Sequence, residues 1–142
     1  MSWWIERLDA LKAGTAEAPL VTRTLRMGLL GDWGEGWTRK TWEPDPAVIG
    51  ADGTLFGGHL AALADQSAAF ATMTVIGDTE VFRTTNLAVQ FFKVTPAVPL
   101  EIEARVVART KRLISVEIDF RRPDGDLVAK ASAQQMVLPA AA

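Results

Sequence analysis

Residues 53–66, GTLFGGHLAALADQ, decide the fold. Two adjacent glycines, Gly57 and Gly58, open an apolar segment rich in Ala and Leu that ends at another glycine. Its length and composition predict a helix over about residues 58–76. A helix that is apolar nearly all round must be enclosed by other elements on most sides. The rest of the chain is therefore expected to wrap around this helix.

After the helix, apolar residues recur at every second position, which predicts strands. The first of the four predicted strands begins at about residue 85 and ends before Pro96, and the others cover residues 100–109, 114–120 and 127–138. Two more strands are predicted before the helix, over residues 19–30 and 36–42, joined by the turn GDWGEG. A short amphipathic helix is expected at residues 2–13. We therefore expect an α+β fold, in which a curved six-stranded antiparallel sheet wraps around one long apolar helix.

Composition limits the class of protein. The chain has 142 residues, of which 49% are hydrophobic, and a formal net charge of −2. These values favour one globular domain over residues 1–142, with its core over residues 20–138, and argue against a nucleic-acid surface. No apolar run approaches a membrane span, and the first residues lack the basic-then-apolar order of a signal peptide. We expect a cytoplasmic protein without nucleic-acid or membrane partners.

The chain contains no cysteine and one histidine, His59. Disulfides, thiolate chemistry and a multi-histidine metal site within one chain are thus excluded. A serine-histidine-aspartate triad of Ser67, His59 and Asp65 is excluded as well, because no two of these positions have the helical spacing that lets side chains meet. We expect His59 to pack or to form a hydrogen bond near the mouth of a site.

Gly57 and Gly58 stand where the helix begins. The first N–H groups of a helix have no partner within the helix, and a glycine lets a ligand oxygen approach them closely. Such groups can stabilise the negative oxygen of a tetrahedral intermediate. The other interpretation is that the two glycines only permit a tight turn or close packing.

Asp65 is the only formally charged residue between the glycines and the end of the predicted helix. Aspartate is a poor residue in the middle of a helix, and burying its charge without a partner costs several kcal/mol. An acid in such a position suits proton transfer to or from water. The alternative is that Asp65 lies on a wet edge of the helix or pairs with Arg83.

Gly57 and Asp65 are eight residues apart, which corresponds to about 12 Å along a helix axis. One carboxylate cannot span this distance to act on a group bound at its own chain's Gly57. The two residues can share a site only if two helices meet antiparallel across a two-fold axis. A catalytic role for both therefore predicts a homodimer.

The segment GTLFGGHLAALADQSAAFA, followed by TTNLAVQFFKVTP, resembles the hotdog-fold thioesterase superfamily, and within it the PaaI-type acyl-CoA thioesterases. The resemblance covers residues 21–138. In that family an apolar helix follows His-Gly-Gly and carries Asp or Glu eight residues after the first glycine, which matches Gly57 and Asp65. The resemblance implies that the Gly57 N–H polarises the thioester carbonyl, while Asp65 of the partner subunit activates or orients water, or attacks directly. Thr84 is the implied helper of the acid, with Thr85 as its neighbouring candidate.

Two positions depart from the family pattern. Phe56 replaces the usual histidine, and Gly50 falls where an Asn or Gln often faces the carbonyl. Loss of one such donor can lower the rate by about a hundredfold. His59 or the backbone of Asp52 are candidate replacements. Phe56, Gly58 and His59 are expected to line the substrate site.

The basic cluster Arg109, Lys111 and Arg112 joins two predicted strands. It is either a solvated hairpin turn or, as the resemblance implies, the place where the phosphates of CoA bind. The resemblance also implies an acyl tunnel between the paired helices, which suggests a medium-chain or aryl-acyl group. Its expected lining is Leu60, Leu63, Phe70 and Met73.

These observations lead to a functional hypothesis: hydrolysis of acyl-CoA thioesters by a homodimer or a dimer of dimers, with no cofactor besides the CoA of the substrate and no metal. The alternative is an acyl-CoA binding or sensor protein on the same fold that does not turn over its ligand. A hotdog hydratase or dehydratase ranks below both, because it needs a histidine beside an acid and His59 is the only histidine. Fold alone does not decide among these.

Overall fold

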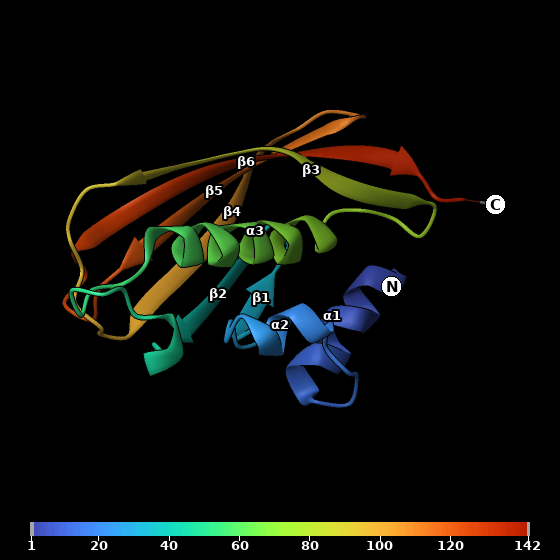
Figure 1. The fold of residues 1–142 in the computed structure, drawn as a ribbon. Coiled ribbons are helices and arrows are strands. Elements are labelled where there is room, and N and C mark those ends of the chain that lie inside the picture. The colour runs from blue at the N-terminus through green and yellow to red at the C-terminus, as the bar shows by residue number, and fades with distance from the viewer. Residues whose placement is uncertain (1, 142) are drawn as a thin grey trace.

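The computed structural model describes residues 2–141, so residues 1 and 142 of the expected domain lie outside the described residues. A six-stranded antiparallel sheet in the order β1-β2-β4-β5-β6-β3 curves over one side of helix α3 (Gly57–Met73), and the N-terminal helices lie on the other side (Figure 1). The strands are β1 (Asp32–Gly34), β2 (Trp37–Trp42), β3 (Glu80–Phe91), β4 (Leu100–Arg109), β5 (Leu113–Arg121) and β6 (Leu127–Pro139). The predicted sheet around one long helix is confirmed.

Small and branched side chains bring α3 close to the sheet. Leu63, Ala64 and Ala68 of α3 are fully buried, and they belong to one core cluster with the inward-facing residues of the strands, among them Ile118 and Phe120. Alanine costs little conformational entropy in a helix and lets the strands approach the helix backbone. The inner face of the sheet and one face of α3 thus form the core.

The predicted N-terminal helix is present as α1 (Trp3–Ala13). Ser2 caps it by accepting a hydrogen bond from the Ile5 N–H, and Gly14 ends it in a left-handed conformation at φ 74°. Leu8 is fully buried in a small second cluster with Met73 of α3. Helix α1 therefore covers part of the α3 face that the sheet leaves open.

The predicted strand over residues 19–30 is wrong. The chain forms a short helix there, α2 (Leu20–Thr24), and the first strand is β1, inside the segment predicted as a turn. A short 3-10 helix, η1 (Pro46–Val48), follows β2. The other boundaries differ less: α3 begins one residue earlier than expected, and β3 begins five residues earlier.

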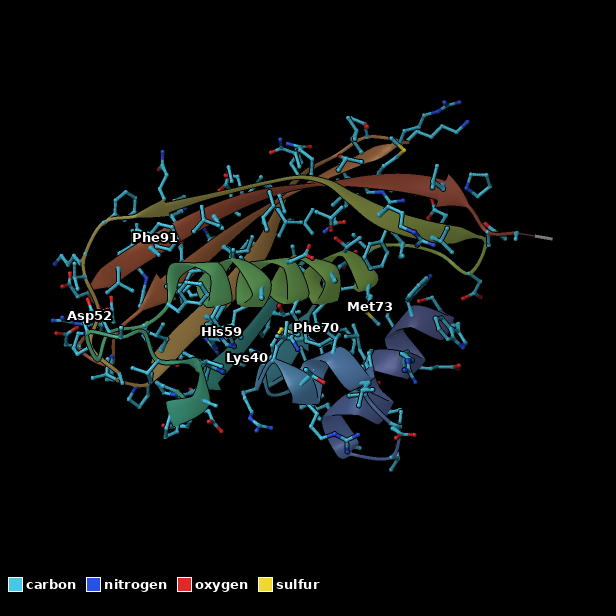
Figure 2. All side chains as sticks on the ribbon, viewed as in Figure 1. Lys40, Asp52, His59, Phe70, Met73 and Phe91 are labelled. Atoms are coloured by element: carbon cyan, nitrogen blue, oxygen red, sulfur yellow. The ribbon has the colours of Figure 1, made fainter. Side chains whose placement is uncertain are left out.

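The predicted strand is absent because the carbonyl groups of residues 25–28 have other partners. These four residues are here called the wall segment. A strand would offer such groups to a neighbouring strand, but each of them meets a side chain of α3 or β2 instead. The pairs are Leu25 O with His59 Nε2, Arg26 O with Trp42 Nε1 (2.9 Å), Met27 O with Lys40 Nζ (2.7 Å) and Gly28 O with Gln66 Nε2 (2.9 Å). Figure 2 shows Lys40 and His59 on the side of α3 that faces the N-terminal helices. Side-chain donors from distant elements thus hold this segment against α3.

Candidate active site

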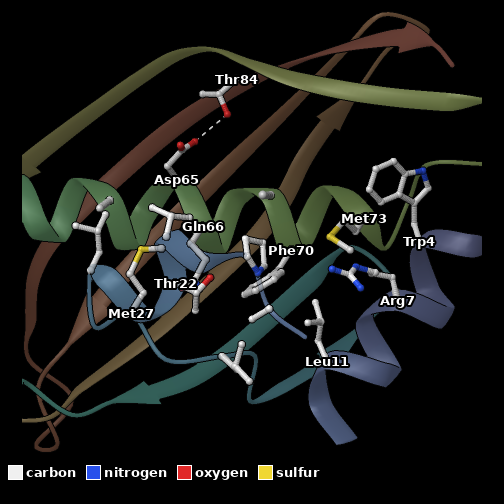
Figure 3. Close-up of a pocket in the computed structure, with 17 residues that line it drawn as sticks. Trp4, Arg7, Leu11, Thr22, Met27, Asp65, Gln66, Phe70, Met73 and Thr84 are labelled. Atoms are coloured by element: carbon white, nitrogen blue, oxygen red, sulfur yellow. Dashed lines mark hydrogen bonds between the residues drawn. The ribbon is translucent and has the colours of Figure 1, made fainter. Parts of the chain in front are cut away.

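Asp65 and Thr84, predicted as an acid and its helper, lie together. Asp65 projects from the middle of α3, and the Thr84 hydroxyl of β3 donates a hydrogen bond to its Oδ1 over 2.8 Å (Figure 3). Asp65 is exposed in the single chain, as the wet-edge interpretation expects. It does not pair with Arg83, whose guanidinium donates to the Phe82 carbonyl instead. The carboxylate is therefore open to a ligand and held by one neutral donor.

Gln135 of β6, which sequence reasoning missed, completes this arrangement. Its side chain is fully buried, and its Oε1 lies 3.0 Å from Thr84 Oγ1, while its Nε2 has no partner among the described residues. A hydroxyl has one hydrogen, so Thr84 cannot donate both to Asp65 and to an amide oxygen. The amide orientation with Nε2 facing Thr84 gives a consistent chain in which Gln135 donates to Thr84 and Thr84 donates to Asp65.

A signal for Gln135 is present in the sequence. The inward-facing positions of β6 are otherwise apolar: Ala129, Ala131, Ala133 and Val137. A single amide in such a row is a buried polar group that needs a partner. Thr84 lies directly opposite Gln135 in the β3–β6 register, and Thr85 is the extra residue of a bulge that follows. Thr85 donates to the Gln134 carbonyl over 3.3 Å.

A cavity of about 420 Å³ opens beside Asp65 and Thr84, between α3 and the N-terminal helices (Figure 3). Most of its lining is apolar. Phe70 and Met73 line it as predicted, whereas Leu60 and Leu63 are buried in the core against the sheet. The other lining residues are Trp4, Arg7, Leu11, Ala18, Pro19, Val21, Thr22, Leu25, Met27, Leu29, Ala62, Gln66 and Ala69.

The wall segment forms one side of this cavity, and Lys40 is one of the residues that hold it. Lys40 is 7% exposed, and its amine donates to Met27 O and to Gln66 Oε1. Burial lowers the pKa of Lys40 to about 8, because removal from water disfavours the charged form. No carboxylate forms an ion pair with it in the part of the chain that the structure describes.

His59 is turned towards the wall segment and away from the acid. Its ring stacks on Trp42 with the centroids 5.1 Å apart, and its Nε2 meets the Leu25 carbonyl. Because a carbonyl only accepts, Nε2 carries the hydrogen. Nδ1 is buried without a partner among residues 2–141. With Phe56 and Gly58, His59 lines a second cavity of about 290 Å³ at the start of α3.

The first two N–H groups of α3 are free, whereas the next two donate to the Phe56 carbonyl. Phe56 is the N-cap residue and supplies no side-chain acceptor. The N–H groups of Gly57 and Gly58 donate no hydrogen bond among the described residues. A Cβ at Gly57 would lie 3.2 Å from the Phe91 ring, and one at Gly58 would lie 3.3 Å from the Phe56 ring. Glycine thus allows two aromatic rings to border an uncapped helix N-terminus.

Gly50 is part of a tight turn. It stands where the family that the sequence resembles often has Asn or Gln. Its N–H donates to the Thr54 carbonyl over 2.7 Å, so this N–H does not point to a substrate. The Asp52 carboxylate accepts from the Thr54 hydroxyl and N–H, which lowers the pKa of Asp52. The Gly50 N–H and the Asp52 carboxylate therefore both find their hydrogen-bond partner within this loop, at Thr54.

The three residues of the predicted basic cluster have different surroundings in the structure. Arg109 forms an ion pair with Glu80 at 3.1 Å and donates to the Val75 carbonyl. The pKa of Glu80 is lowered by the Gly77 N–H and by Arg109. Lys111 and Arg112 line a wide surface hollow beside Glu80. The role of these cations in binding phosphates stays a prediction.

Two further observations concern metals and membranes. Within residues 2–141, no cluster of three or more His, Cys, Asp or Glu side chains has the arrangement of a metal site. None of the helices in the same residues has the length and hydropathy that a membrane span requires.

Comparison with known structures places the fold. A putative thioesterase from Ralstonia eutropha, described as related to phenylacetic acid degradation, is 27% identical with a TM-score of 0.80, covering 91% of this chain and 98% of its own. A thioesterase from Haemophilus influenzae is 16% identical with a TM-score of 0.80, covering 93% and 90%. A hypothetical thioesterase from Streptococcus pneumoniae, solved with coenzyme A, is 18% identical with a TM-score of 0.71, covering 80% and 87%.

No curated protein sequence matches the chain. A family model described as "Thioesterase superfamily" matches residues 52–129, which is more than half of the chain and includes Asp65 and Thr84. The match and the shared fold confirm the resemblance to hotdog-fold thioesterases, including the type related to phenylacetic acid degradation. They also support thioester hydrolysis as the general activity. The chain belongs to the thioesterase superfamily.

Proposed function

We propose that this protein hydrolyses acyl-CoA thioesters with a medium-chain or aryl-acyl group. The observation that carries the proposal is the hydrogen-bonded Asp65–Thr84 pair in the lining of a mostly apolar cavity. Asp65 accepts a proton as water adds to the thioester carbonyl. The C–S bond then breaks, and the CoA thiolate leaves with a proton returned by Asp65, so the products are the free acid and CoA.

The oxyanion of this reaction needs a donor that the same chain cannot supply. Gly57 and Asp65 stand about 12 Å apart along α3, by the rise of an α-helix. The free N–H groups at Gly57 and Gly58 suit a negative oxygen. We infer that the donor at each Asp65 is the Gly57 N–H of a second copy, so that the dimer carries two shared sites.

Strand β3 offers the surface for that dimer. It is 12 residues long, lies at one edge of the sheet and pairs only with β6 among the described strands. A long edge strand with free N–H and C=O groups tends to pair with another chain. Thr84 lies on β3, so pairing of two β3 strands would bring two sites to one interface. A dimer of dimers would use further surfaces.

Two observations support CoA as the thiol part of the substrate. The neighbour from Streptococcus pneumoniae was solved with coenzyme A. In this chain, Lys111 and Arg112 form no ion pair among residues 2–141, so both can meet phosphates. Arg109 is engaged with Glu80 and would contribute less.

The test measures free thiol released from a panel of acyl-CoAs by wild type and Asp65→Asn. We expect Asp65→Asn to lower kcat by about a hundredfold or more, because the base is lost while shape is kept. Glu35→Gln is the matched control, since Glu35 is an exposed turn residue without a hydrogen bond or ion pair among the described residues. Equal rates for wild type and Asp65→Asn would contradict the proposal.

A non-catalytic acyl-CoA binder is the second candidate. It is favoured by Phe56 in place of a histidine and by the Gly50 turn, whose N–H is already used. Tight binding of acyl-CoAs without thiol release across the panel would support it. A hydratase is disfavoured, because no hydrogen bond joins His59 to Asp65 in the described residues and the His59 Nε2 is engaged with Leu25.

A further inference from the structure

Arg7 is the one positively charged residue among those that line the cavity beside Asp65. It projects from α1, and its guanidinium points towards Phe70 and Met73 of α3 (Figure 3). The only other charged residue of the lining is Asp65. The cavity thus has an acid at one place, a cation at another and apolar side chains between them.

The Arg7 guanidinium has donors to spare. Its one hydrogen bond within the described residues runs from Nη2 to the Glu17 carbonyl over 3.2 Å, and no carboxylate forms an ion pair with it there. A guanidinium carries five N–H donors in a planar fork that matches a carboxylate. The side chain is half-buried, so its head is partly removed from water without receiving a counter-charge. An anion in the cavity would supply an acceptor for the unused donors and the missing counter-charge.

The spacing along α3 sets the size of that anion. Asp65 and Met73 lie eight residues apart on the helix, about 12 Å by the helical rise. A thioester carbonyl at Asp65 would direct an extended acyl chain past Phe70. The far end of a chain of medium length would then come to Arg7.

We propose that the cavity selects acyl groups that end in a carboxylate, so that the preferred substrates are CoA monothioesters of medium-length α,ω-dicarboxylic acids. Arg7 binds the terminal carboxylate, and the apolar lining holds the methylene chain. This inference rests on the proposed thioesterase function. It adds a specificity residue from α1, which lies outside the residues matched by the family model.

The experiment compares suberyl-CoA with octanoyl-CoA, which differ by a terminal carboxylate in place of a methyl group. We expect wild type to favour suberyl-CoA in kcat/KM. In Arg7→Met the ratio of the two kcat/KM values should fall by about tenfold to a hundredfold, the size of a lost charge-assisted hydrogen bond. Octanoyl-CoA has no carboxylate for the guanidinium to bind, so its kcat/KM should change much less than that of suberyl-CoA. Arg7→Lys should retain part of the preference, because it keeps the charge but not the fork.

Arg23→Met is the matched control, since Arg23 lies nearby on α2 and does not line this cavity. It removes the same charge and should leave the ratio unchanged. Activity of each variant on octanoyl-CoA shows that the variant is folded.

The outcomes separate this inference from the function on which it rests. Octanoyl-CoA hydrolysis with no preference for suberyl-CoA, or an equal loss on both substrates in Arg7→Met, would overturn the role of Arg7 and leave the thioesterase proposal standing. If wild type hydrolyses neither ester nor any other acyl-CoA of the panel, the thioesterase proposal fails. The same comparison is then made on dissociation constants, and there equal suberyl-CoA affinity in wild type and Arg7→Met would refute the inference.

Discussion

Thr84 has a single hydroxyl hydrogen, and its neighbours decide where that hydrogen points. With the Gln135 amide donating to Thr84, the hydrogen is free to face Asp65, which orients one carboxylate oxygen. The other carboxylate oxygen is then left for water. Gln135 is fully buried and reaches Asp65 only through Thr84, so it is a positioning residue.

We therefore predict that Gln135→Leu lowers kcat by about tenfold while KM changes little, because substrate contacts are kept and only the orientation of Asp65 is lost. Gln134→Leu is the control: it changes the neighbouring glutamine, whose Oε1 accepts from Ser115. Steady-state kinetics on one acyl-CoA measure both. A parallel loss in kcat for the two variants, or a rise in KM alone, would rule out a positioning role.

At this scale the sequence identified part of the site. The lone acid on an apolar helix indicated Asp65, and family resemblance indicated Thr84; the structure brings them to 2.8 Å. Gln135 was missed although the alternation of β6 marked it, because only pairing with β3 shows what it faces. Arg7 was missed because charged residues on a short surface helix are common, and only the tertiary fold turns this one to a cavity.

At the scale of elements, the wall segment shows why the predicted strand at residues 19–30 does not form. Alternating and branched residues favoured extended structure there. Side chains that lie far away in the sequence donate hydrogen bonds to its carbonyls, so the segment packs against α3 and does not pair with a strand. Local pattern cannot anticipate donors that only tertiary structure brings near, whereas the strands with clear alternation and a partner were predicted well.

Lys40 in this arrangement leads to a pH prediction. In the folded protein the pKa of Lys40 is about 8, and its unfolded value is near 10.5. Between these values the unfolded chain binds more protons than the folded one, so the free energy of unfolding rises with pH across this window. One pKa unit corresponds to about 1.4 kcal/mol, so the rise should be roughly 3 kcal/mol.

Urea unfolding at a series of pH values from 7 to 10 measures this rise. The chain has no tyrosine and no cysteine, so lysines are the side chains that titrate in the upper part of this range. Lys40→Met should remove the slope, and Lys12→Met, which changes an exposed lysine, should retain it. A wild type whose stability is flat or falls from pH 8 to 10 would contradict a buried, desolvated amine.

At the scale of the whole molecule, a shared active site can be tested by mixing two defective chains. Asp65→Asn lacks the acid, and Gly57→Pro lacks the N–H at the first helical position, where proline is accepted. Each homodimer should be inactive. In a random mixture, half of the dimers carry one intact site, so we expect about a quarter of wild-type activity per chain.

Gly57→Ala is the control for crowding, since it keeps the N–H while adding a Cβ that meets the Phe91 ring. Thiol release after the two variants are refolded together is the measurement. If the mixture is no more active than either variant alone, although mixed dimers form, the acid and the N–H do not act across an interface. In the sequence, both the spacing of Gly57 and Asp65 and the family resemblance led to this dimer, whereas the edge position of β3, its proposed surface, emerged only from the fold.

The way in which the wall segment is held has a consequence for redesign. Its hydrogen bonds to α3 and β2 run through main-chain carbonyls, and its Met27 side chain is buried in the core. The side chains of Leu25 and of Leu29, the residue directly after the segment, line the cavity and take no part in this attachment. Both are exposed, each by 37%. Their size can therefore change without moving the backbone that bears them. The groups that hold this side of the cavity in place are thus different from the side chains that shape it. New acyl specificities can therefore be sought at Leu25 and Leu29 while Asp65 and Thr84 are kept.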